Sequence, residues 1–287
     1  MEKTNKTTVQ DWWAENPMTY STTHGENEYD GINIQPGTLE FYDRLDQEFY
    51  SWNKPLHDIK KFDKLFPYEN FKGKKILEIG CGQGTMASNW SKNGANITAV
   101  DLNPTSVELA KKRFDLYHLD GKILQADGNK LEFEDNTFDY VYSWGVLHHS
   151  PNLDKSISEL FRVLKPCGQF GVMLYNRKSI REWYIVNYVE GFLHNESKYL
   201  NNLQLNSRYG DGEREEGNPH TWPVTEKEMF KLFGKYSSDT KIRVLGTDLD
   251  SIFKFLLPGL GLFIPQFIKK VWARRFGWSL WIHGTKS

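Results

Sequence analysis

A short apolar strand that runs into a glycine-rich turn is the feature that most constrains the fold of this chain. The strand covers residues 76–79, and the turn reads Gly80-Cys81-Gly82-Gln83-Gly84. A second apolar strand ends about 20 residues further on at Asp101. Glycine lets the backbone pass close to a ligand, and a carboxylate at the tip of the next strand can accept hydrogen bonds from both ribose hydroxyls. The pattern therefore predicts a nucleoside site.

The glycine spacing indicates which nucleoside is bound. A dinucleotide fingerprint needs Gly-x-Gly-x-x-Gly, but Thr85 stands at the third glycine position and Gly84 comes one residue early. A nicotinamide oxidoreductase is therefore disfavoured, and tight binding of NADH would be needed to support it.

Strands and helices alternate regularly through the middle of the chain. We expect strands near 75–80, 97–101, 122–126, 138–143 and 169–175, and helices near 85–93, 104–117 and 153–163. This alternation predicts an α/β, Rossmann-like fold with a parallel sheet, whose ligands sit at the carboxyl ends of the strands. Residues 242–245 and 278–282 are expected to form two further strands.

The series of motifs resembles class I S-adenosylmethionine-dependent methyltransferases of the methyltransferase type 11 kind. The resemblance covers about residues 70–176 and consists of these pieces in family order: Glu78-x-Gly80-x-Gly82-x-Gly84, Asp101, Gln125 to Gly128, Phe138 to Ser143, Val146 to His149, and Arg162 to Pro166. It implies a seven-stranded sheet that ends in an antiparallel pair, with S-adenosylmethionine as the cofactor. One departure is Cys167, where the family turn usually carries a glycine.

The resemblance also implies roles for individual residues. Glu78 would face the amino group of the cofactor's methionine part, Asp101 would bind the ribose, and Leu102 would form a wall for the adenine. The expected cofactor-binding residues are Glu78, Gly80, Cys81, Gly82, Gly84, Asp101, Leu102, Ala126, Asp127, Gly128 and Ser143. Two simpler readings stay open: the glycines could form only a tight turn, and Asp127 could be only a helix N-cap. A carboxylate in an apolar strand needs a partner when buried, which supports a ligand role for Glu78.

His148 and His149 are the candidate catalytic residues. They follow the fourth strand, where the resemblance places the methyl donor beside the acceptor, and a histidine can remove a proton from an attacking group near neutral pH. A histidine tied into a backbone hydrogen bond is the alternative. Methyl transfer from a sulfonium does not strictly require a base, because alignment and exclusion of water can supply most of the acceleration.

The chain divides into four expected segments: an N-terminal lid at 1–70, a cofactor-binding core at 71–176, an insertion or cap at 177–224, and the end of the sheet at 225–287 with an apolar insertion at 248–277. The lid is rich in aromatic residues, including Trp12 and Trp13. Thr38 and Thr225 are expected to cap helices. Residues 207–223 read as a polar loop. The candidate acceptor-binding residues are Tyr20, His24, Tyr175, Asn176, Arg177, Arg208, Tyr209, His220 and Trp222; ordinary solvated loop positions are the alternative.

The late segment 252–275 is apolar over most of its length and carries basic residues near its C-terminal end. Its uncharged run is shorter than the about 20 residues that a membrane span needs, and Pro258 and Pro265 interrupt it. A weak contact with a membrane surface is one reading; a hydrophobic cap or a homodimer contact is the favoured one.

Composition limits the partners. Charged residues make up 25% of the chain and the formal charge is −1, so we expect no nucleic-acid substrate. The two cysteines form neither a disulfide framework nor a zinc-ligand pattern, so we expect a metal-free site and, with no apolar leader at the start, a cytoplasmic protein. The expected function is methylation of a small molecule at oxygen, with nitrogen as the second choice. A glycan or lipid-linked acceptor, or a non-catalytic cofactor-binding protein, is the alternative.

Overall fold

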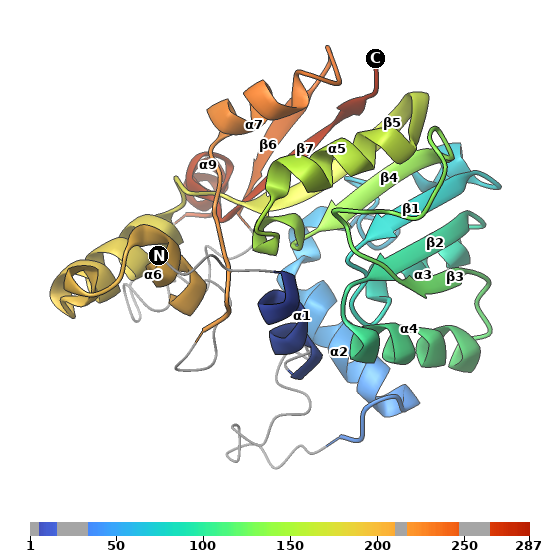
Figure 1. Ribbon diagram of the computed structural model, residues 1–287, viewed down its shortest axis with the longest axis horizontal. Coiled ribbons are helices and arrows are strands. Elements are labelled where there is room, and N and C mark those ends of the chain that lie inside the picture. The colour runs from blue at the N-terminus through green and yellow to red at the C-terminus, as the bar shows by residue number, and fades with distance from the viewer. Residues whose placement is uncertain (1–5, 16–33, 210–216, 247–264) are drawn as a thin grey trace.

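A seven-stranded sheet forms the centre of the computed structural model, which describes residues 6–15, 34–209, 217–246 and 265–287 (Figure 1). The strands are β1 (Lys75–Ile79), β2 (Asn96–Asp101), β3 (Lys122–Gln125), β4 (Phe138–Trp144), β5 (Leu164–Tyr175), β6 (Lys241–Leu245) and β7 (Ser279–Thr285). Their order is β3-β2-β1-β4-β5-β7-β6. β7 runs antiparallel to β5 and β6, and the other pairs are parallel. The α/β, Rossmann-like fold and its closing antiparallel pair are thus confirmed.

The helices fall close to the expected positions. They are α1 (Lys6–Glu15), α2 (Leu39–Trp52), α3 (Thr85–Lys92), α4 (Pro104–Leu116), α5 (Leu153–Val163), α6 (Asn202–Tyr209), α7 (Glu226–Phe233), α9 (Gln266–Phe276) and a π-helix, η5 (Glu182–Leu193). Short 3₁₀ turns are η2 (Lys54–Leu56), η3 (Tyr68–Phe71), η4 (Leu147–His149) and η6 (Glu196–Lys198).

Two expected boundaries are wrong. β5 begins at Leu164 rather than near 169, because Leu164 already pairs with Phe138 of β4. The pairing is then irregular up to Gln169, and Cys167 in this stretch adopts a left-handed φ of 60°. A glycine would adopt this conformation with less strain. The polar loop expected at 207–223 is also wrong at its start: Ser207, Arg208 and Tyr209 are the last turn of α6, where Ser207 is buried.

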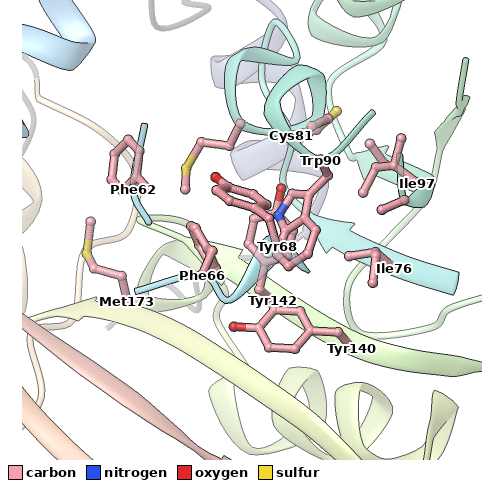
Figure 2. Close-up of a cluster of buried hydrophobic side chains, with 14 of the residues drawn as sticks. Phe62, Phe66, Tyr68, Ile76, Cys81, Trp90, Ile97, Tyr140, Tyr142 and Met173 are labelled. Carbon is pink, nitrogen blue, oxygen red and sulfur yellow. The ribbon is translucent and has the colours of Figure 1, made fainter. Parts of the chain in front are cut away.

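Alternation along the strands separates two cores. Ile76 and Tyr142 point into one face, which α3 and α4 cover, whereas Leu77 and Val141 point into the other face, which α5 and α7 cover. Figure 2 shows the first core, in which aromatic rings surround the buried indole of Trp90. Glu78 is two residues after Ile76, so its side chain belongs to this aromatic face.

Helix α2, in the N-terminal segment, packs against this core. Thr38 caps it as expected, accepting a hydrogen bond from the Phe41 N–H at 3.2 Å. The Tyr42 hydroxyl donates to the Leu109 carbonyl at 2.6 Å, and Asp46 pairs with the buried Arg113 at 2.8 Å. Both contacts reach α4, so α2 lies against the helix that follows β2.

The capping box of α7 offers a direct stability test. Thr225 Oγ1 accepts from the Glu228 N–H at 3.3 Å, and the Glu228 carboxylate accepts from the Thr225 N–H at 2.7 Å. We expect Thr225→Ala to lower the free energy of unfolding by about 1 kcal/mol, measured by urea denaturation. Ser238→Ala, at an exposed position, is the control. An equal effect of both substitutions would contradict the role of the cap.

Candidate functional site

The glycine turn after β1 leaves an open surface at the carboxyl edge of the sheet. Gly80, Gly82 and Gly84 all have a positive φ, of 81°, 49° and 78°. A Cβ at Gly80 would lie 2.4 Å from the Val146 side chain, which requires glycine, whereas a Cβ at Gly82 would meet no atom of the described residues within 4 Å. The backbone at Gly82 therefore borders open space, where a ligand can approach it closely.

Asp101 joins this turn to the end of β2. Its two carboxylate oxygens accept hydrogen bonds from the backbone N–H of Gly82 at 2.8 Å and of Asn103 at 2.9 Å. Burial raises the pKa of Asp101, and these backbone donors act in the opposite direction. Each carboxylate oxygen has a second lone pair, so the fixed carboxylate can still accept from ribose hydroxyls.

Glu78 lies beneath the turn, in register with Tyr142 on β4. Burial raises its pKa to about 8, and the neighbouring Asp101 charge adds to this effect. Its Oε2 is buried and has no hydrogen-bond partner among the described residues. A buried carboxyl with an unused acceptor fits a cationic ligand group, because an ammonium would both donate to it and stabilise its charged form. The residues present therefore fit S-adenosylmethionine.

The expected adenine side lies next to Asp101. The Ala126 N–H donates to the Asp101 carbonyl at 2.9 Å, and the Leu102 carbonyl accepts from the Gln125 side chain at 3.1 Å. Asp127 accepts from the Asn129 N–H at 3.0 Å in a tight turn, so it is not a helix N-cap. The structure thus brings these predicted residues together at the ends of β2 and β3. A Cβ added at Gly128 would lie 3.1 Å from the Ile79 side chain, so Gly128 lies close to the end of β1.

Ser143 and Cys81 are two further predicted cofactor residues, and both are buried. The Ser143 hydroxyl donates to the Ile79 carbonyl at 2.7 Å, which ties β4 to β1 behind the turn. The Cys81 thiol has a raised pKa because it is buried and lies near Asp101 and Glu78, so it stays protonated. A direct cofactor contact remains a prediction for both.

The hydrogen bonds of His149 determine its tautomer. Its Nδ1 lies 3.0 Å from the His220 carbonyl oxygen and 3.1 Å from Thr221 Oγ1. The Thr221 hydroxyl donates to Asn218 Oδ1 at 2.8 Å. Because a carbonyl can only accept, Nδ1 carries the proton in neutral His149, and Nε2 is the basic nitrogen.

His148 has a different setting. Its ring is fully buried and lies 3.9 Å from the Tyr175 ring, which in turn stacks on Trp278 at 4.5 Å. Burial, and then the nearby His149, lowers the pKa of His220. The region past β4 is thus an aromatic wall beside one oriented imidazole, and this arrangement favours His149 over His148 as a base.

Helix α1 connects the two halves of the site. Asn103, which caps α4, also donates from Nδ2 to the Trp13 carbonyl, and the Trp13 ring lies 5.3 Å from the ring of His149. Trp13 therefore reaches from the end of β2 to the turn after β4. Sequence reasoning placed Trp13 in an aromatic lid but missed its role in the site, and it missed Asn103, Asn218, Thr221 and Trp278 altogether. Only the Asn-Pro pair at 103–104, a helix-start signal, pointed to one of them.

Several predicted acceptor residues hold the insertion in place. Arg177 pairs with Glu228 at 2.9 Å and lies over the Trp222 ring at 5.0 Å. The Asn176 side chain donates to the Gly277 carbonyl at 2.9 Å. Arg208 and Tyr209 lie on α6, with Arg208 3.8 Å from Glu196. A substrate contact remains a prediction for these residues, and Tyr20 and His24 lie outside the described residues.

Comparison with protein families and curated proteins agrees with this geometry. Residues 77–172 match the model of a methyltransferase domain. A sterol 24-C-methyltransferase of Gibberella zeae is 30% identical over 193 residues, which are 61% of this chain and 48% of that protein. A sterol 4-C-methyltransferase of Caenorhabditis elegans is 41% identical over 96 residues, 33% of this chain and 29% of that protein. A phthiotriol/phenolphthiotriol dimycocerosates methyltransferase of Mycobacterium leprae is 33% identical over 117 residues, 40% and 43% of the two chains. The chain thus spans less than half the length of each of these relatives.

Solved structures share the fold. A SAM-dependent methyltransferase of Methanosarcina mazei aligns with a TM-score of 0.54 at 21% identity, covering 77% of this chain and 98% of the other. A Pyrococcus horikoshii protein aligns with a TM-score of 0.53 at 16% identity, covering 91% and 99%. At these identities the likeness concerns the fold alone.

The contacts of Asp101 generate a binding prediction. Asp101→Ala removes a charged acceptor, and we expect it to weaken the binding of S-adenosylhomocysteine by roughly 1.5 to 3 kcal/mol in calorimetry. Asp139→Ala is the control, since Asp139 also accepts a backbone N–H, from Lys75, but at the opposite edge of the sheet. An unchanged affinity of Asp101→Ala would remove this residue from the site.

The raised pKa of Glu78 predicts proton release on binding. Below pH 8 the buried Glu78 carboxyl is protonated, and a bound ammonium favours its charged form. Binding of S-adenosylhomocysteine at pH 7 should therefore release about one proton. Calorimetry in buffers of different protonation enthalpy measures this number. Glu78→Gln should abolish the release, whereas Glu182→Gln, a buried carboxyl with a raised pKa in the insertion, should not.

The same carboxyl affects stability without ligand. Because the folded pKa of Glu78 lies above the unfolded value, its contribution is intact below about pH 4.5 and is lost as the pH rises through 8. Glu78→Gln should remove that part of the pH dependence, as measured by denaturation at pH 5 and 8. Identical profiles for both proteins would contradict the assignment.

Proposed function

We propose that this chain, whose residues 77–172 form a class I S-adenosylmethionine-dependent methyltransferase domain, methylates a small molecule with a largely apolar, lipid-like body. The observation that carries the proposal is the oriented His149 Nε2 beside the aromatic wall of His148, Tyr175 and Trp278. The relatives add support, since they are named as sterol and phthiotriol/phenolphthiotriol dimycocerosates methyltransferases.

Three parts of the chain would hold the cofactor. Glu78 would bind its ammonium, Asp101 its ribose hydroxyls, and the turn at Gly82 would allow the backbone to approach it. S-adenosylmethionine supplies a methyl group on a positively charged sulfur, which leaves as a neutral thioether. Trp13 and the aromatic wall would exclude water from the neighbouring space, which strengthens alignment of the acceptor.

A neutral acceptor must lose a proton when the bond between its acceptor atom and the transferred methyl carbon forms. His149 Nε2 would take this proton, and the resulting imidazolium would keep its Nδ1–H bonded to the His220 carbonyl, which stabilises the positive charge. This role suits a hydroxyl as well as an unsaturated carbon. The sequence favoured oxygen, whereas the relatives named as C-methyltransferases favour carbon.

The acceptor class can be tested with methyl-labelled S-adenosylmethionine. We expect label from the purified protein to enter the lipid fraction of a cell extract and to stay out of the water-soluble fraction. Magnetic resonance of the labelled product distinguishes a methyl on oxygen from one on carbon. Label in the water-soluble fraction alone would contradict a lipid-like acceptor, and binding without any product would favour a non-catalytic cofactor-binding protein.

The tautomer of His149 leads to a prediction about catalysis. We expect His149→Ala to lower turnover by about 10² to 10⁴ with little change in cofactor affinity, because only the proton acceptor is lost. His283→Ala on β7 is the control. A His149→Ala variant that keeps most of its turnover would leave alignment as the source of catalysis.

A further inference from the structure

The π-helix η5 carries an exposed column of aromatic rings. Trp183, Tyr188 and Phe192 stack in sequence, with ring centroids 6.3 and 6.0 Å apart and interplanar angles of 11° and 17°. Trp183 is 65% exposed and Phe192 68%. In an α-helix, residues five apart point about 140° away from each other, so Trp183 and Tyr188 share a face because of the π-helical register. A rare helical form here aligns apolar rings toward solvent.

Helix α9 presents a second exposed apolar face, and this face is flanked by positive charges. Phe267 is 69% exposed and Val271, one turn later, is 59% exposed. Lys270 and Arg274 lie beside them, also one turn apart, and α9 contains no acidic residue. Like charges four residues apart repel each other unless an anion lies over them. The opposite side of α9 carries the half-buried Ala273, which packs against Gly246 after β6.

Both helices are attached to the aromatic wall of the proposed acceptor site. The Arg181 guanidinium, at the start of η5, lies 4.5 Å from the Trp278 ring, just after α9, and Trp278 stacks on Tyr175. The Asn176 side chain also binds the Gly277 carbonyl. In Figure 1, α9 and the insertion lie on the same side of the molecule, beyond the β5–β7 pair. A chain of contacts therefore runs from Arg181 at the start of η5, through the rings of Trp278 and Tyr175, to His148.

We propose that the aromatic column of η5 and the basic face of α9 dock on the surface of an anionic lipid bilayer, from which the acceptor enters the site. The inference rests on the proposed lipid-like acceptor and extends it to where that acceptor is collected. Charge complementarity supports it: the whole chain has a formal charge of −1, so the cations of α9 are a local feature. Tryptophan and tyrosine suit the interface between lipid and water, and the basic side chains suit lipid phosphates. Among the described helices, none is long and apolar enough to cross a membrane, so the contact is peripheral.

Co-sedimentation with vesicles tests the docking surface. We expect the full chain to pellet with phosphatidylcholine vesicles that contain phosphatidylglycerol, and to be released by high salt or when the anionic lipid is omitted. Lys270→Glu/Arg274→Glu should lower the partition coefficient by roughly tenfold or more. Lys227→Glu/Lys231→Glu makes the same charge change on an exposed face of α7 and should leave binding unchanged. Trp183→Ser/Phe192→Ser should weaken binding at low salt, where the wild type is bound.

The outcomes separate docking from catalysis. Wild-type protein that stays in the supernatant with anionic vesicles, or an equal loss of binding in the α7 control, would overturn the inference. Loss of a concentration-dependent dimer in Trp183→Ser/Phe192→Ser, without vesicle binding by the wild type, would assign the surface to self-association and overturn it as well. Affinity for S-adenosylhomocysteine shows that each variant is folded. Vesicle binding without methylation of any lipid would count against the proposed acceptor and leave the docking intact.

Discussion

The pairing of the glycine turn with the Asp101 carboxylate is the contact on which the rest of the site depends. The hydrogen bond from Gly82 holds the ends of β1 and β2 together at the edge of the sheet. The register of β1 with its two neighbours places a second carboxyl, Glu78, below the turn, where burial makes its charged form costly. A cofactor with an ammonium and two ribose hydroxyls would satisfy both groups, so the unliganded turn is electrostatically prepared for one kind of ligand.

The acceptor side is built differently, from segments far apart in the chain. His149 follows β4, its hydrogen-bond acceptors come from the insertion, and Trp13 reaches it from α1. Trp278 stacks on Tyr175 from the last part of the chain. Each side chain is positioned by contacts with another segment, which explains why a sheet common to many methyltransferases can serve different acceptors.

The two exposed helical faces extend this arrangement outward. The core carries its apolar side chains inward on both sides of the sheet, as Trp90 illustrates, whereas η5 and α9 leave large rings and cations in solvent. Such exposure is costly in water and is usually linked to an interaction. A lipid surface would cover the rings and neutralise the cations in one contact, close to the proposed entrance.

The sequence by itself determined the strands of the sheet and the cofactor turn, because strand periodicity and glycine spacing are local properties. Thr38 and Thr225 were found as helix caps for the same reason. The role of Glu78 came from the family resemblance, and the roles of Asp101 and Glu78 stay predictions. Only the tertiary structure decided the tautomer of His149, its contact with Trp13 and the burial of His148, because each depends on segments far apart in the chain. The hydrogen-bond partners of His149, for example, are His220 and Thr221, which lie 71 and 72 residues away. The π-helical register of η5 also escaped prediction. Apolar spacing favours an ordinary helix there, whereas η5, which contacts η6 and α6, adopts the form that aligns Trp183 with Tyr188.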